Sequence, residues 1–250
     1  MPPLLVAWEA VGSENTGYNF IFDEMAHAKS IEKTKPTSSA DDEETPEEGN
    51  DQEELSVAII LLAAGSSTRM GQSKQLLQIN KEPLLLHSTR AALASGVKNV
   101  VVILGANEQA HRDVLTNLPI TIITNHYWKS GMGSSIKTGM NNLLRLFPET
   151  AAVVIMVCDQ PAITGNHLRM LIQKFEDTKG PIIASAYADT AGVPVLFARP
   201  FFSNILMLRD EHGAKKIIQQ FSTKVNTVDF PGGLHDLDTT EDYKNFIDGK

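Results

Sequence analysis

Six apolar residues, Val57-Ala58-Ile59-Ile60-Leu61-Leu62, run without a break into a loop rich in glycine and serine, Ala63-Ala64-Gly65-Ser66-Ser67-Thr68-Arg69-Met70-Gly71-Gln72-Ser73-Lys74. An apolar run without polar alternation is typical of a strand that is covered on both faces, as in a parallel sheet. Glycine lets the backbone after the strand approach a ligand closely. This stretch therefore predicts a buried parallel strand that ends in a binding loop.

Similar apolar runs recur downstream, and helix-like segments lie between them. The strand-like runs are residues 100–104, 120–124, 152–158, 182–186, 193–197 and 225–228. The helical segments are residues 83–93, 134–146, 166–175 (with Thr164 or Asn166 as cap) and 214–221, and a last helix starts in capping-box fashion at Asp238-Thr239-Thr240-Glu241. This alternation predicts an α/β three-layer sandwich with a mostly parallel sheet, in which ligands bind beyond the carboxyl ends of the strands.

The first loop has the chemistry of a phosphate site. Successive backbone N–H groups around Gly65 can form a cradle for an anion. Arg69 offers a two-pronged hydrogen-bond donor to phosphate oxygens, and Lys74 adds a compact positive charge. The spacing matches neither a P-loop nor the Gly-x-Gly-x-x-Gly dinucleotide fingerprint. A flexible loop with solvated charges fits the same residues, and both interpretations stay open.

Three further loops carry candidate residues. Asp159, in Cys158-Asp159-Gln160-Pro161, can hold Mg²⁺ against phosphate oxygens or simply form the turn before the proline. The segment 125–135 contains Gly131-Met132-Gly133-Ser134-Ser135, which can bring N–H groups against a ligand or cap a helix. The acids of 236–242 are explained by capping, notably Asp238, and metal binding by Asp236 or Asp238 is the alternative.

The composition excludes several classes of protein. The net charge is −8, but residues 1–55 hold 14 Asp and Glu against 3 Lys, a balance of −11, so residues 56–250 carry +3. We expect residues 1–55 to be an N-terminal extension that is largely a disordered acidic linker, and residues 56–250 to be the folded domain. The balance of the domain is too weak for nucleic-acid binding. No apolar run is long enough to span a bilayer, the single cysteine excludes a disulfide within the chain, and the seven histidines show no metal-ligand spacing. We therefore expect a soluble cytoplasmic protein.

Taken together and in this order, the motifs resemble the MobA-like nucleotidyltransferase family, most closely its molybdenum cofactor cytidylyltransferase branch. The likeness covers residues 56–248 and rests on the segments 62–71 with Lys74, 125–135 with Gly139, 158–161, 192–197 and 236–243. It implies a Rossmann-like nucleotide-diphospho-sugar transferase fold and transfer of a nucleotide to a phosphate acceptor with release of pyrophosphate. It also implies site residues: Lys74, Arg69 and Asp159 as catalytic; Ala63, Ala64, Gly65, Arg69, Lys74 and Ser135 as nucleotide-binding; Asp159 with Asp238, or Asp236 in its place, as ligands of Mg²⁺.

Within that family, Ala64 resembles the cytidylyl-transferring members, whereas guanylyl-transferring members more often carry glycine there. The implied substrates are CTP and molybdopterin or its molybdenum form, and a xanthine-dehydrogenase-type enzyme is the implied recipient of the product. Ser73 departs from the family's proline, and Arg209-Asp210-Glu211-His212-Gly213-Ala214 departs from its Gly-Asp-x-Gly-Ala on the acceptor side. The alternatives are a relative that uses another base or a sugar- or alcohol-phosphate acceptor, and a non-catalytic carrier or insertion factor for molybdenum cofactor. Some family members are described as oxidoreductases, and the missing dinucleotide fingerprint argues against that activity here.

Overall fold

The computed structural model describes residues 55–249, so the predicted acidic extension lies outside the described residues except for Leu55. The described residues form a seven-stranded sheet in the order β5-β4-β1-β6-β8-β7-β9, together with a small β2–β3 hairpin. The strands are β1 (Val57–Ala63), β2 (Gln78–Ile79), β3 (Glu82–Pro83), β4 (Asn99–Leu104), β5 (Thr121–Thr124), β6 (Ala152–Val157), β7 (Ile182–Tyr187), β8 (Thr190–Ala198) and β9 (Val225–Asp229). The ladders β1–β4, β1–β6, β4–β5 and β7–β9 are parallel, and β8 alone runs antiparallel to both of its neighbours. The prediction of a mostly parallel sheet is confirmed.

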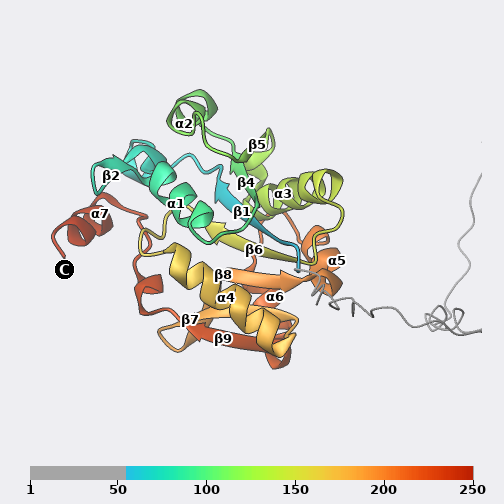
Figure 1. The fold of residues 1–250 in the computed structure, drawn as a ribbon. Helices are drawn as coiled ribbons and strands as arrows, with labels where there is room; N and C mark the ends of the chain where they lie inside the picture. The colour runs from blue at the N-terminus through green and yellow to red at the C-terminus, as the bar shows by residue number, and fades with distance from the viewer. Residues whose placement is uncertain (1–54, 250) are drawn as a thin grey trace, which may run out of the picture. The chain divides into compact units, whose positions relative to one another are not determined.

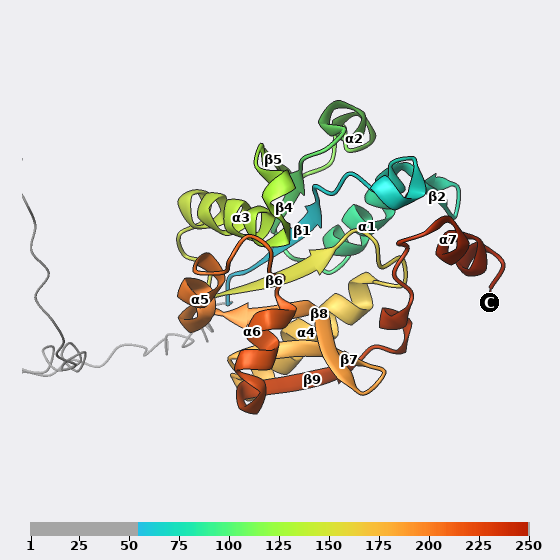
Figure 2. The same cartoon turned by 180° about the vertical axis from the view of Figure 1, so that it is seen from behind.

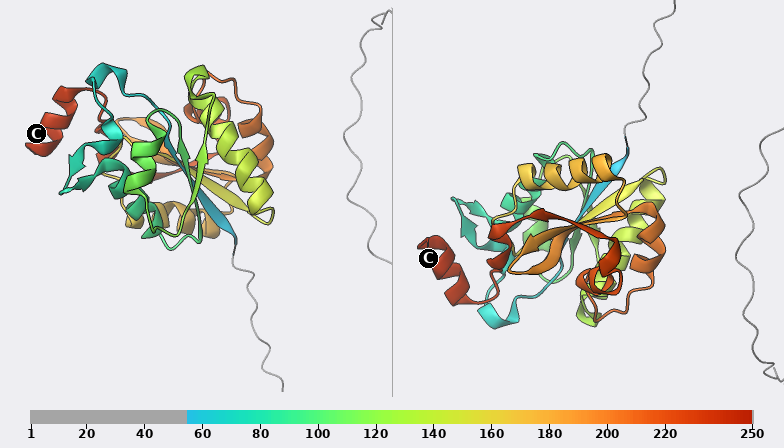
Figure 3. Two further views of the ribbon diagram at one scale, coloured as in Figure 1. Left: turned by 90° about the horizontal axis from the view of Figure 1, so that it is seen from above. Right: turned by 90° about the horizontal axis from the view of Figure 1, so that it is seen from below.

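Helices cover both faces of the sheet. The α-helices are α1 (Leu84–Leu93), α2 (Glu108–Val114), α3 (Met132–Leu146), α4 (Gly165–Thr178), α5 (Phe202–Leu206), α6 (Lys215–Gln220) and α7 (Thr240–Ile247). Helices α1 and α4 lie in front of the sheet in Figure 1, and the view from behind in Figure 2 shows α3, α5 and α6 on the opposite face. Seen along the sheet in Figure 3, the strands lie between the two helical layers, which confirms the three-layer sandwich.

The apolar character of β1 follows from these two layers. All seven of its residues are buried. Ile59 and Leu61 belong to the core beneath α1 and α4, whereas Ile60 and Leu62 belong to the core beneath α3 and α6. Gly139 of α3 lies so close to the sheet that an added Cβ would stand 2.9 Å from Ile60 Cγ2. Close helix packing therefore explains Gly139, which together with residues 125–135 forms the second motif of the family resemblance.

Several short elements were not predicted. Helix α2 has no apolar stripe, and α5 has only five residues, so neither shows helical periodicity in the sequence. The helices predicted at 134–146 and 166–175 are present with extended ends, and Thr164 is the cap of α4, because its side chain accepts a hydrogen bond from the N–H of His167. Among residues 55–249, no helix combines the length and apolar composition needed to cross a membrane.

Candidate active site

The loops that follow β1, β5 and β6 meet at one cavity. These strands are parallel and joined through β1 and β4, so their carboxyl ends lie at the same edge of the sheet. The cavity measures about 340 Å³. It is lined by Leu62, Ala63, Ala64, Gly65, Ser66, Lys74, Gln75, Trp128, Lys129, Gly131, Met132, Ser135, Val157, Cys158 and Asp159. Three of the four loops singled out in the sequence therefore form one site.

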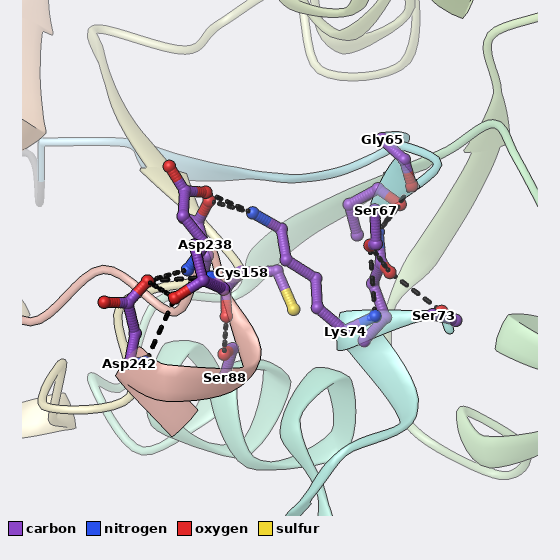
Figure 4. A network of polar contacts seen from close by, with 12 residues as sticks. Gly65, Ser67, Ser73, Lys74, Ser88, Cys158, Asp238 and Asp242 are labelled. Carbon is purple, nitrogen blue, oxygen red and sulfur yellow. Dashed lines mark hydrogen bonds and ion pairs between the residues drawn. The ribbon is translucent and has the colours of Figure 1, made fainter. Parts of the chain in front are cut away.

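Lys74 is the centre of charge in this site. Its Nζ lies 2.6 Å from Asp159 Oδ2 and 3.1 Å from Asp238 Oδ1, and its side chain is only 16% exposed. Figure 4 shows the Lys74 side chain extending from the loop toward Asp238. Burial by itself lowers the pKa of Lys74, but the charge and hydrogen bond of Asp159, with those of Asp238, outweigh it, so the pKa lies above the ordinary 10.5. Lys74 is therefore a fixed cation between two carboxylates.

The interpretation of Asp238 as a helix cap is wrong. The cap of α7 is Thr239, whose side chain accepts from the N–H of Asp242 while the Asp242 carboxylate accepts from the N–H of Thr239. The capping box is therefore shifted by one residue, and Asp238 contacts Lys74 instead. The N–H of Leu237 donates to the carbonyl of Asp159 at 2.9 Å. This hydrogen bond holds the segment against the turn at Asp159, for which the sequence analysis considered metal binding.

Asp236 lies near the same carboxylates. Burial, together with the negative charges of Asp159 and Asp238, raises the pKa of Asp236 above its ordinary value. The structure thus brings all three predicted metal candidates into one neighbourhood, with Asp159 and Asp238 closest to the cation of Lys74.

The residue set fits a magnesium ion only in combination with phosphate. Within the described residues, no group of three or more His, Cys, Asp or Glu side chains is arranged to hold a metal ion. Mg²⁺, however, is usually bound by one or two carboxylates, and substrate phosphates and water supply the remaining oxygens. Asp159 and Asp238 already share one cation, Nζ of Lys74. A metal ion can take the place of Nζ between the two carboxylates if the Lys74 side chain moves to pair with a phosphate.

The remaining predicted nucleotide residues lie on the wall of the cavity. Gly65 is exposed and has open space where a side chain would stand, whereas Ala63 and Ala64 are buried. Ser135 lies in the first turn of α3 and accepts a hydrogen bond from Asn125 Nδ2 at 3.0 Å. Arg69 belongs to a 3-10 turn, Thr68–Met70, and its side chain lies outside the described part of the chain.

The second motif is built around Asn125, which is fully buried. Its Nδ2 donates to Ser134 Oγ at 2.8 Å as well as to Ser135, and its Oδ1 accepts from the N–H of Tyr127. Ser134 is hydrogen-bonded to carbonyls of its own loop, those of Tyr127 and Gly131. Asn125 and Ser134 therefore organise the loop, and Ser135 is the hydroxyl of this group that lines the cavity.

The glycines of the same motif lie under the loop that departs from the family. A Cβ on Gly131 would stand 2.3 Å from the carbonyl oxygen of Asp210, and a Cβ on Gly133 would stand 2.2 Å from that of Arg209. The N–H of Gly133 donates to the Asp210 carbonyl at 2.8 Å, and the Asp210 carboxylate pairs with Lys137 at 2.6 Å. These glycines are therefore required by backbone packing.

Sequence reasoning missed Gln75 and His111. Gln75 is 1% exposed and makes hydrogen bonds to both ends of the first loop, and His111, on α2, contacts Ser73 at 2.7 Å. A polar residue directly after Lys74 in an otherwise apolar segment was the available signal for Gln75. No local pattern marks His111. Cys158, interpreted as a small buried residue, is buried, and burial raises the pKa of its thiol to about 12, so the thiol stays protonated.

Comparisons with known proteins show what this chain is similar to. Nicotine blue oxidoreductase of Paenarthrobacter nicotinovorans is 32% identical over 143 residues, which cover 55% of this chain and 65% of that protein, slightly less than two thirds of its length. Purine catabolism protein PucB of Bacillus subtilis is 25% identical over 195 residues, covering 74% and 92%. A probable molybdenum cofactor guanylyltransferase of Synechococcus elongatus is 29% identical over 124 residues, covering 49% and 60%.

A solved structure shares the architecture. The crystal structure of Rv0371c from Mycobacterium tuberculosis H37Rv superimposes with a TM-score of 0.68 at 25% identity, and the match covers 78% of this chain and 98% of that one. The family model for the MobA-like NTP transferase domain matches residues 59–225, from within β1 to the first residue of β9. The chain therefore belongs to the MobA-like NTP transferase domain family.

Proposed function

We propose that the protein transfers CMP from CTP to the phosphate of molybdopterin or molybdenum cofactor, with Mg²⁺ and with release of pyrophosphate. The observation that carries the proposal is the triad of Lys74, Asp159 and Asp238 at the end of a glycine-rich loop. A buried ammonium between two carboxylates, facing a loop of backbone N–H groups, suits a metal–triphosphate better than any other ligand class.

The reaction needs positioning and charge neutralisation rather than a protein nucleophile. An oxygen of the acceptor phosphate attacks the α-phosphorus, the bond to the bridging oxygen of the β-phosphate breaks, and pyrophosphate leaves with that electron pair. In this proposal the first loop holds the triphosphate, and Lys74 faces the negative charge that develops on it. A bound Mg²⁺ would further neutralise the triphosphate, with Asp159 and Asp238 as its protein ligands.

Ala64 supports a pyrimidine base. It is buried at the wall of the cavity, and its carbonyl accepts a hydrogen bond from the N–H of Ala106 at 3.0 Å. The choice of CTP rests on the resemblance of this alanine to the cytidylyl-transferring members of the family, and Ala64 is placed where it would line the site of the nucleotide. The name of the Synechococcus relative refers to guanylyl transfer.

Other activities make different demands on these residues. A relative with a sugar- or alcohol-phosphate acceptor would use the same Lys74 and Asp159 and differ at the 209–214 loop. A carrier of molybdenum cofactor has no need for a cation clamped between two carboxylates. The name of one relative refers to an oxidoreductase activity. The cation of Lys74 between two carboxylates supports phosphoryl transfer instead. In the cell, we further propose a xanthine-dehydrogenase-type enzyme as recipient of the product.

The test is pyrophosphate release by the purified full chain with Mg²⁺ and a molybdopterin acceptor, in separate reactions with CTP, GTP, ATP and UTP. We expect release with CTP. Release with GTP alone would keep the transfer reaction and overturn the choice of base. Nucleotide binding without release would point to another acceptor, and absence of both binding and release would refute the proposal.

A further inference from the structure

Gln75 lies buried beneath the first loop and is hydrogen-bonded on both sides of its amide. Nε2 donates to the carbonyl of Gly65 at 2.8 Å and to that of Ala63 at 3.3 Å. Oε1 accepts from Ser67 Oγ at 3.1 Å and from Ser73 Oγ at 2.8 Å. Figure 4 shows Gly65, Ser67 and Ser73 on the side of Lys74 that lies away from Asp238. Both amide hydrogens and the amide oxygen are thus used by the loop itself.

The orientation of this amide is fixed by its partners. A rotation that exchanged Oε1 and Nε2 would place an oxygen against two carbonyl oxygens and lose both donated hydrogen bonds. The loop is held from both of its ends, because Ala63 ends β1 while Ser73 precedes Lys74. The N–H of Lys74 also donates to Ser67 Oγ at 3.0 Å, which closes the loop on itself.

These hydrogen bonds determine where the loop presents its N–H groups. In a trans peptide the carbonyl and the N–H of the next residue point in opposite directions. With the carbonyls of Ala63 and Gly65 turned to Gln75, the N–H groups of Ala64 and Ser66 point away from it. Both of these residues line the cavity. Gln75 therefore favours a loop whose donors face an anion.

Ser73 extends the support to α2. Its hydroxyl hydrogen is donated to Gln75, so its oxygen accepts from His111 Nε2, 2.7 Å away. His111 is fully buried, and within the described residues its Nδ1 has no hydrogen-bond partner, as expected for a neutral ring protonated on Nε2. Ser73 has φ −66°, the angle that proline adopts. The family's proline constrains the backbone at this position, whereas this chain holds it by hydrogen bonds.

We propose that Gln75 is a positioning residue for the triphosphate: it turns the N–H groups of Ala64 and Ser66 toward the cavity, and Ser73 with His111 holds its amide in that orientation. The inference rests on the proposed function, because it takes the ligand of the loop to be a nucleoside triphosphate.

The experiment compares Gln75→Glu with wild type in the full chain. Glutamate keeps the size of the side chain but sets an oxygen against the two carbonyls. We expect the affinity for CTP with Mg²⁺, measured by calorimetry, to fall at least ten-fold, and KM for CTP to rise more than KM for the acceptor. Gln78→Glu, the same change at an exposed position three residues on, is the control and should leave both values unchanged. A general loss of fold would lower kcat instead.

Amide hydrogen exchange separates this inference from the proposed function. In nucleotide-free protein, Gln75→Glu should speed exchange at Met70 and Lys74, whose N–H groups are hydrogen-bonded to Ser67 within the loop, while β1 and β6 stay protected. Ser73→Ala, which keeps the amide of Gln75, should speed it less and weaken CTP binding two- to five-fold; it serves as the variant if Gln75→Glu does not fold. If the wild-type protein binds no nucleotide, the proposed function is refuted, and hydrogen exchange alone then shows whether Gln75 holds the loop. CTP affinity unchanged in the variants, or unchanged exchange at Met70 and Lys74, overturns the role of Gln75.

Discussion

Replacing Lys74 with methionine should strengthen the binding of a divalent metal to the nucleotide-free protein while it weakens the binding of the triphosphate. In the structure, Nζ of Lys74 neutralises Asp159 at 2.6 Å and Asp238 at 3.1 Å. A metal ion that binds these carboxylates must first displace the ammonium. Lys74→Met removes this internal competitor and leaves two negative charges side by side.

The magnitude follows from the burial of the pair. Two unit charges about 4 Å apart attract by ~4 kcal/mol near a protein surface and by ~1 kcal/mol in bulk water. The side chain of Asp159 is 23% exposed and that of Asp238 40% exposed, so the interaction lies toward the screened end, and desolvation of Lys74 offsets part of it. A net change of about 1.4 kcal/mol corresponds to roughly ten-fold tighter metal binding. Turnover should instead fall by roughly two to four decades, since a preorganised charge is lost.

Mn²⁺ titration followed by the electron paramagnetic resonance signal of the free ion measures the first effect, and pyrophosphate release measures the second. Lys129→Met is the matched control, because Lys129 also lines the cavity and its Nζ lies over the Trp128 ring, 5.5 Å from the centroid, with no carboxylate partner among the described residues. It changes the net charge equally and should not tighten Mn²⁺ binding. Equal or weaker Mn²⁺ binding in folded Lys74→Met would show that Lys74 does not compete for the carboxylates.

Further predictions concern the metal, the glycines and pH. Asp159→Asn should abolish Mg²⁺-dependent pyrophosphate release with little change in melting temperature, and turnover like wild type would remove Asp159 from the site. Gly133→Ala should destabilise the fold by about 1–3 kcal/mol in thermal melts, because the new Cβ meets the carbonyl oxygen of Arg209. Gly65→Ala has open space around it and should leave the melting temperature unchanged while nucleotide affinity falls; the opposite pattern in this pair would contradict the assignment of the two loops. Burial lowers the pKa of His167 from 6.5 to about 4, so the unfolded chain binds a proton at this residue at a higher pH than the folded protein does. The free energy of unfolding should therefore fall by about 3 kcal/mol as the pH drops from 6.5 to 4. Denaturation of His167→Gln over that range should lack this component, and an unchanged pH slope would refute it.

The centre of the sheet was predictable because its central strands are buried on both faces. Val57–Ala63 shows no polar alternation, and the same holds for most of Ala152–Val157. The antiparallel direction of β8 was not predictable, since strand direction depends on the path of the chain between strands. Helix α2 was missed because its buried residue, His111, is polar, and its apolar contacts are made at its C-terminal end by Val114 and the following Leu115 rather than along an apolar stripe.

The charged centre was predictable only in part. Lys74 and Asp159 each follow an apolar strand, so their meeting at one edge follows from a parallel sheet. Asp238 lies 164 residues from Lys74 in the sequence. Locally it is as good a helix cap as Thr239, and only the fold shows that Thr239 takes the cap and Asp238 takes the lysine. Gln75 and His111 were missed for the same reason, because their partners are backbone carbonyls and two serines, Ser67 and Ser73, that only the folded loop brings near.

Residues 209–214, which differ in sequence from the family's pattern, have their backbone held by contacts with the second motif. The carbonyls of Arg209 and Asp210 pack against Gly133 and Gly131, and a hydrogen bond runs from the Gly133 N–H to the Asp210 carbonyl. These contacts involve the backbone of the loop, so its side chains can vary, at the cost of the Lys137–Asp210 ion pair when residue 210 changes, while the first turn of α3 that carries Ser135 stays in place. The first loop and the 209–214 loop can therefore change independently. If the acceptor binds beside this loop, as the proposed function implies, Asp210, Glu211 and His212 are the side chains to vary in a search for acceptor specificity.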